Sequence, residues 1–136
     1  MIDRSDERIK QTGEVFTPMS LVYEILDKLP PNVWHKDKTF LDNSCGDGNF
    51  LEGVLRRKVQ THKHKVLHAL STIYGVDLMF DNVKHAQDRL VAIAKELDSS
   101  VHANKYRAIV NKNIVCHDAL TYDYSFGEEK DDLLGW

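Results

Sequence analysis

The feature that most constrains this chain is a short apolar run that ends in an acid and is followed by a loop with two glycines. The run ends at Asp42, the glycines are Gly46 and Gly48, and apolar residues at helical spacing follow them. This order predicts a strand over residues 39–42, a tight turn, and a helix that runs to about Lys58.

A strand, turn and helix in this order form a place for a ligand. Gly46 and Gly48 allow positive φ and a close approach of a ligand to the main chain, and the helix that follows offers N–H groups to a carboxylate or phosphate. Asp42 would repel a pyrophosphate but can hold an ammonium group, so a zwitterionic amino-acid moiety fits better than a dinucleotide. The glycine spacing also fails the dinucleotide fingerprint, which needs three glycines.

The segment from Asp42 to Leu51 resembles the glycine motif of S-adenosylmethionine-dependent methyltransferases, in the Asp-x-x-Cys-Gly-x-Gly-x-Phe-Leu form shared by N6-adenine DNA methyltransferases. The resemblance implies a Rossmann-like class I methyltransferase fold with S-adenosyl-L-methionine as cofactor. The residues that it assigns to the cofactor loop are Asp42, Asn43, Ser44, Cys45, Gly46, Gly48 and Phe50.

The segment before this loop has two interpretations. Thr17 is suited to an N-cap and Pro18 to the first helical position, and an apolar stripe then continues to Leu29 before two prolines, so a capped amphipathic helix explains it without a ligand. The run from Gly13 to Pro18 is also similar to the family segment that closes over the methionine end of the cofactor. That resemblance implies cofactor contacts from Glu14, Phe16, Thr17 and Pro18.

A second acid ends the next predicted strand, over residues 71–78. An acid at this position can accept hydrogen bonds from both hydroxyls of a ribose. The resemblance implies that Asp77 holds the ribose while Leu78 and Met79 pack on the adenine. The plainer alternative is a surface acid at the end of a strand.

A third predicted strand, over residues 114–117, follows a long amphipathic helix over residues 80–97 and a shorter one over residues 103–110, with a turn at residues 111–113. After this strand comes Asp118-Ala119-Leu120, similar to the family's third motif. The resemblance implies that the Asp118 side chain and the following backbone N–H read the adenine edge of the cofactor, since an acceptor beside a donor matches the amino group and N1 of adenine.

A basic cluster separates the first two motifs and contains three histidines and two lysines. His64 and His68 could share a helix face and bind a metal, but no third ligand stands nearby, so a solvated basic face is favoured. Contact with phosphate is a further possibility that the sequence does not decide.

Bulk properties predict one soluble domain. The chain has 136 residues, 42% of them apolar, a net charge of −3 and two cysteines. The net charge gives no general attraction to nucleic acid. We expect a cytoplasmic protein, because the chain has few cysteines, no membrane span and a polar start. We expect a flexible arm over residues 1–11 and a tail over residues 121–136.

The resemblance ends before catalysis. The family's Asp/Asn-Pro-Pro-Tyr/Phe loop, which holds a flipped adenine, has no counterpart here, so no catalytic residue is assigned. We therefore expect a truncated fold with three parallel strands, whose first strand has an exposed edge. Three coverings are possible: a homodimer, a partner chain that also brings DNA, or the tail, with Tyr122, Tyr124, Phe126, Leu133, Leu134 and Trp136.

Overall fold

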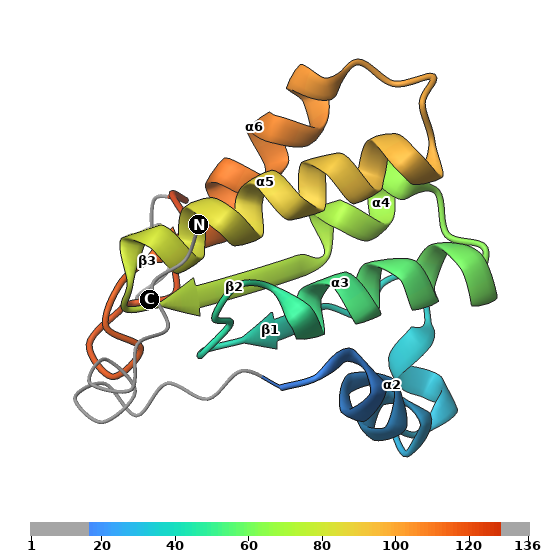
Figure 1. The fold of residues 1–136 in the computed structure, drawn as a ribbon, viewed down its shortest axis with the longest axis horizontal. Helices are drawn as coiled ribbons and strands as arrows, with labels where there is room; N and C mark the ends of the chain where they lie inside the picture. Colours follow the sequence, from blue (N-terminus) through green and yellow to red (C-terminus); the bar gives the residue numbers. More distant parts are fainter. Residues whose placement is uncertain (1–16, 129–136) are drawn as a thin grey trace, which may run out of the picture.

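The computed structural model describes residues 17–128 and has mixed α/β architecture (Figure 1). Three strands form one parallel sheet in the order β1, β2, β3, and they are β1 (Phe40–Asp42), β2 (Ile73–Asp77) and β3 (Ile114–Cys116). In the register, Phe40 lies opposite Ile73 and Gly75 lies opposite Ile114. Because the strands are parallel, their carboxyl ends meet at one edge of the sheet.

Helices connect the strands and pack on one another. The helix α3 (Asn49–Arg56) continues as the π-helical segment η2 (Arg57–Thr61), and α4 (Val66–Ser71) leads into β2. In the chain, the long helix α5 (Phe80–Leu97) and then α6 (Ala103–Asn113) follow β2 and precede β3. The helix α6 packs on α5 and α4. The helix α2 (Met19–Asp27) packs on α3, and the 3₁₀ turn η1 (Pro31–Trp34) follows it (Figure 1).

A single apolar core lies between the sheet and these helices. It contains Leu51 and Leu55 of α3, Ile73 of β2, and Leu90 of α5, each at most 1% exposed. Gly75 is needed where α3 crosses β2, because a Cβ at this position would lie 2.9 Å from Cδ1 of Leu51. The close contact between helix and strand positions the loop that joins β1 to α3.

The beginning of the tail covers the opposite face of β2. Since side chains alternate along a strand, Tyr74 and Val76 point away from the face on which Gly75 meets α3. Val76 is fully buried although it lies outside the main core, and the Phe126 ring packs 4.7 Å from the Tyr74 ring. Tyr122, Tyr124 and Phe126 do fold back, but onto Tyr74 of β2 and not onto the free edge of β1, which the described part of the tail leaves unpaired. Leu133, Leu134 and Trp136 lie outside the described residues.

The first helix begins differently from the expectation. Pro18 is the N-cap residue, with an extended backbone, and the helix begins at Met19. No side-chain hydrogen bond caps it, so the prediction of Thr17 as N-cap and Pro18 as first helical residue is wrong. The Pro18 carbonyl instead accepts the N–H of Val22 at 3.0 Å.

Other boundaries also differ. Residues 71 and 72 precede β2 rather than belonging to it, because Ser71 ends α4 and the Thr72 hydroxyl donates to the Ala69 carbonyl at 2.7 Å. Residues 111–113 form the last turn of α6 rather than a separate turn. His64 lies in the connection before α4, so His64 and His68 do not share a helix face.

Within residues 17–128, β1 is hydrogen-bonded to β2 alone, which leaves its other edge unpaired as expected. None of the helices in this range is long and apolar enough to cross a membrane. Cys45 and Cys116 are both free thiols.

Candidate functional site

The carboxyl edge of the sheet brings two acids into electrostatic contact. Asp42 ends β1 and Asp77 ends β2. Burial raises the pKa of Asp42, the Ser44 N–H opposes this by donating to its Oδ1 at 3.1 Å, and the nearby Asp77 charge raises it further. The two predicted acids from neighbouring strands therefore lie at one site, close enough for the charge of Asp77 to act on Asp42.

The glycine loop wraps around the end of β2. The Cys45 N–H donates to the Val76 carbonyl at 3.0 Å, and the Gly46 N–H donates to Asp77 Oδ1 at 3.0 Å. Gly46 has φ +53° and Gly48 has φ +97°, in the left-handed region that glycine adopts without strain. Both glycines are thus used as the sequence predicted, to turn the chain tightly between strand and helix.

Asp77 holds this loop in place. Its Oδ1 accepts the Gly46 N–H, and its Oδ2 accepts the Met79 N–H at 3.0 Å and the Asn82 side-chain amide at 3.1 Å. Asp77 is 7% exposed. A carboxylate has about four lone-pair positions, so three protein donors leave one position for a ligand. The sequence interpretation of Asp77 missed this structural role.

Cys45 is buried rather than presented to a ligand. Its side chain packs toward Gly75, where a Cβ would lie 3.1 Å from the Cys45 Sγ. Burial, with the charges of Asp42 and Asp77, raises the pKa of this thiol well above its ordinary value. Because the thiolate is the reactive form, burial disfavours reaction at Cys45, whose side chain acts as a packing residue of the loop.

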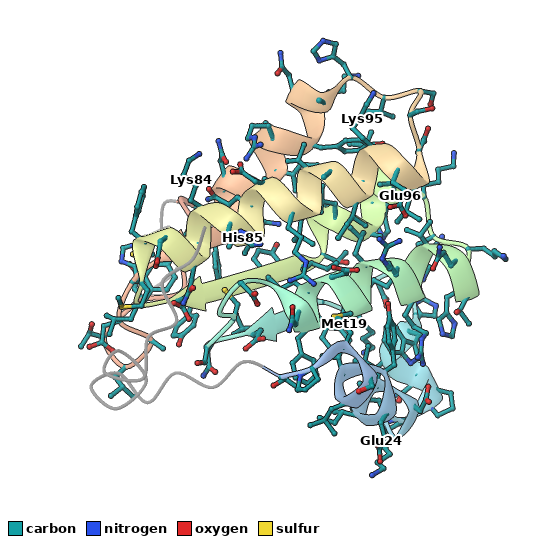
Figure 2. The ribbon with its side chains drawn as sticks, in the orientation of Figure 1. Met19, Glu24, Lys84, His85, Lys95 and Glu96 are labelled. Carbon is teal, nitrogen blue, oxygen red and sulfur yellow. The ribbon has the colours of Figure 1, made fainter. Side chains whose placement is uncertain are left out.

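The start of the described chain lies beside the glycine loop. The Asn49 side-chain amide, at the beginning of α3, donates to the Thr17 carbonyl at 2.5 Å. Arg89 of α5 contacts the same region, with its Nε 2.6 Å from Glu52 and its Nη1 3.7 Å from Asp47. Figure 2 shows Met19 at the start of α2, close to α3. Thr17 is thus beside the predicted loop, whereas Glu14 and Phe16 lie outside the described residues.

The third predicted segment forms an exposed turn after β3. Asp118 Oδ1 accepts the Leu120 N–H at 2.9 Å, and the Ala119 carbonyl accepts the Tyr124 hydroxyl at 2.7 Å. The turn is joined to the site because the His117 N–H donates to the Asp77 carbonyl at 3.1 Å.

Three large apolar side chains are exposed in segments that follow β2 and β3. They are Leu78 at 60%, Phe80 at 70% and Leu120 at 94% exposure. Leu78 and Leu120 are among the predicted cofactor residues, and Phe80 was not. Exposed apolar side chains of this size provide a surface against which a planar ring can pack.

Phe50 lies beside β1 and not at the end of β2, where the glycine loop contacts Asp77. Together with Asp42 and Asn43 it lines an apolar cavity of about 250 Å³ between α2, α3 and the free edge of β1, where Ile25 and Leu41 also contribute. Asn43 and Phe50 therefore lie on the side of β1, Gly46 and Asp77 lie at the end of β2, and Asp42 adjoins both because it lines this cavity and is also near Asp77.

Two buried polar residues were missed by sequence reasoning. Asn82 is fully buried and donates to Asp77, and Lys58 is fully buried and donates to the Lys38 carbonyl at 3.0 Å and to the Thr72 hydroxyl at 2.6 Å. The signal for Lys58 was present, because it continues the buried stripe of Leu51 and Leu55 at helical spacing. No sequence signal identifies Asn82.

Metal ligands do not gather at this site: residues 17–128 contain no group of three or more His, Cys, Asp or Glu side chains able to hold an ion. The site described above therefore rests on the sheet edge, the loop and two acids. Comparison of the chain with protein-family models, with curated proteins and with solved structures found no match.

Proposed function

We propose that this chain is an S-adenosylmethionine-binding domain of the N6-adenine DNA methyltransferase type, with the cofactor-binding half of a Rossmann-like class I fold. The observation that carries the proposal is the pair Asp42 and Asp77, at the ends of adjacent parallel strands, with a two-glycine loop wrapped around the end of β2. Ligands of open parallel sheets bind outside the carboxyl ends of the strands, which is where this pair lies.

The charge of the site suits a cationic ligand. Among residues 17–128, Asp42 accepts the Ser44 N–H and forms no ion pair, although it lies near a second carboxylate. A ligand ammonium placed at Asp42 would offset the repulsion between the two carboxylates. S-adenosylmethionine carries this ammonium group and also a positive sulfonium, whereas a dinucleotide brings negative phosphates.

The nucleoside part of the ligand finds apolar and polar partners at the same edge. Leu78, Phe80 and Leu120 are exposed and offer a packing surface for adenine. We assign Asp77 a single hydrogen bond to the ribose, through the lone pair left on Oδ1, because its other positions hold the loop. We assign Asp118 the adenine edge through Oδ2, because its Oδ1 accepts the Leu120 N–H.

Methyl transfer requires a second component in this proposal. Positioning the amino nitrogen of a DNA adenine is a separate task from binding the cofactor, and no residue of the described chain is assigned to it. The free edge of β1 and the apolar cavity beside it are where a partner chain or a second copy would complete the sheet. DNA is bound only with that partner, and the two free thiols fit a reducing, cytoplasmic setting.

The experiment that tests the proposal compares two ligands by calorimetry. S-adenosylmethionine has the ammonium group, and methylthioadenosine has the same nucleoside without it. Asp42→Asn should weaken binding of S-adenosylmethionine by about tenfold or more, since a charge-assisted hydrogen bond contributes roughly 1.5–3 kcal/mol. It should leave methylthioadenosine binding unchanged. Asp98→Asn, at the half-buried C-cap of α5, removes the same charge away from the site and should alter neither affinity.

A second candidate is a catalytically inactive regulator or a protein-interaction remnant of a methyltransferase. The observation that favours it is that Asp77 and Asp118 already use acceptor positions within the protein. A remnant would not bind S-adenosylmethionine at micromolar concentration. A regulator would bind it but would not support methylation of duplex DNA with any partner chain, whereas a component of a split enzyme would.

A further inference from the structure

A second concave site lies at the opposite, amino-terminal edge of the sheet. Residues 34–36, before β1, and residues 62–68, which run from the end of η2 into the first turn of α4, line a cavity of about 650 Å³. In Figure 1 the connection from α3 to α4 lies at the end of the molecule away from the strand tips. Four histidines, three lysines and one tryptophan line the cavity, and no acid does.

Three contacts hold the two segments in a fixed arrangement. His64 Nε2 lies 2.8 Å from the Trp34 carbonyl oxygen, and His68 Nε2 lies 2.5 Å from the Lys36 carbonyl oxygen. The His62 ring stacks on the Trp34 ring at 5.2 Å with an interplanar angle of 7°. The cavity is therefore formed before any ligand arrives, which lowers the entropic cost of binding.

The lysines of this cavity are not neutralised. Lys36 and Lys65 are exposed and form no side-chain hydrogen bond or ion pair within residues 17–128. The nearest acid along the chain, Asp37, accepts from His35 at 2.6 Å. The cavity thus concentrates unpaired positive charge in a chain whose net charge is −3.

We propose that this cavity binds a phosphorylated ligand of nucleotide size, with the Lys36 and Lys65 ammonium groups on the phosphate oxygens. Ammonium groups form charge-assisted hydrogen bonds with phosphate, and a nucleobase can stack on the exposed ring of His62, whose other face rests on the buried Trp34 ring. The volume is within the usual range for small-molecule sites, roughly 300–1,000 Å³, and exceeds what one phosphate ion fills. The ligand is a free nucleotide or one nucleotide of a single strand.

The cavity is independent of the proposed cofactor site, because the two lie at opposite edges of the sheet. Failure of one proposal therefore leaves the other intact. Far-ultraviolet circular dichroism and the urea midpoint of each variant below should equal those of the wild type, which tests that the variants are folded without relying on the cofactor site.

The test is titration by calorimetry with cytidine 5′-monophosphate, inorganic phosphate and a pentanucleotide of deoxycytidine, none of which carries adenine. The test variant is Lys36→Gln with Lys65→Gln. The matched control is Lys84→Gln with Lys105→Gln, on α5 and α6, which removes the same charge elsewhere; Figure 2 shows Lys84 on α5.

We expect cytidine 5′-monophosphate to bind the wild type more tightly than inorganic phosphate. The test variant should bind it at least about tenfold more weakly, since charge-assisted hydrogen bonds are lost, and the control within about twofold of the wild type. Tighter binding of the pentanucleotide identifies a single strand as the ligand, and equal or weaker binding identifies a free nucleotide. Absence of binding by all three probes, or equal loss in both double variants, would overturn the proposal.

Discussion

Removing the Asp77 carboxylate should destabilise the fold itself, before any question of ligand binding. In Asp77→Ala the N–H groups of Gly46 and Met79 and the amide of Asn82 lose their acceptor, and Asn82 is fully buried. Each unsatisfied buried donor costs about 1–3 kcal/mol, so with partial access of water we expect a loss of roughly 3–5 kcal/mol in the free energy of unfolding. That is a large part of the stability of a domain of this size.

Urea denaturation without ligand, followed by circular dichroism, measures this loss. Asp118→Ala is the matched control, because Asp118 is exposed and its side chain accepts one N–H, that of Leu120. Its loss should stay below about 1 kcal/mol. If Asp77→Ala lowers the free energy of unfolding no more than Asp118→Ala does, the assignment of Asp77 as the anchor of the glycine loop is refuted.

Three further predictions concern buried groups. Burial lowers the pKa of Lys58 to about 8, so between about pH 8 and 10.5 the unfolded chain binds more protons than the folded one. The free energy of unfolding should therefore rise with pH over this range, by at most about 3 kcal/mol. Urea titrations should show this rise in the wild type and not in Lys58→Met. Gly53→Ala places a Cβ 2.6 Å from Cγ1 of Val22 and should cost about 1–3 kcal/mol by thermal or urea unfolding, and an unchanged stability would contradict the packing of α2 on α3. Alkylation at pH 8 should modify Cys116 before Cys45, whose thiol pKa burial raises well above its ordinary value, and mass spectrometry showing the reverse order would contradict the buried position of Cys45.

The helix over residues 80–97 shows what sequence pattern predicts well. Its apolar spacing predicts a helix over these residues, and the Asp98-Ser99-Ser100 run predicts where it ends. The structure has α5 at Phe80–Leu97, with the same bounds. The order of three strands, each before or after such a helix, is likewise confirmed. These features depend on neighbours close in the chain, which is why pattern reasoning reaches them.

The function of single side chains in the site depends on contacts that are distant in the sequence. Asp77 accepts from Gly46, 31 residues away, so its saturation by protein donors could not be predicted from a strand that ends in an acid. The cavity at residues 34–36 and 62–68 also joins segments about 30 residues apart. The basic cluster was therefore interpreted as a solvated face, and its enclosure against Trp34 was missed.

The burial of Lys58 and the position of His64 outside a helix were not predicted from the sequence pattern. Lys58 continues a buried stripe and is fully buried, but in the sequence it marked only the end of the predicted helix. Lys63 has φ +62°, which interrupts helical geometry just before His64 and separates His64 from the helix that contains His68. A positive φ at a residue other than glycine is not visible in a sequence pattern.

The most direct measurement of the central claim is a titration of the ¹⁵N-labelled protein with S-adenosylmethionine, followed through its glycine amide signals. We expect the amide signals of Gly46 and Gly48, in the loop around β2, to shift and saturate at micromolar ligand, while that of Gly127, in the tail, stays in place. Unchanged Gly46 and Gly48 signals at millimolar ligand would contradict this claim.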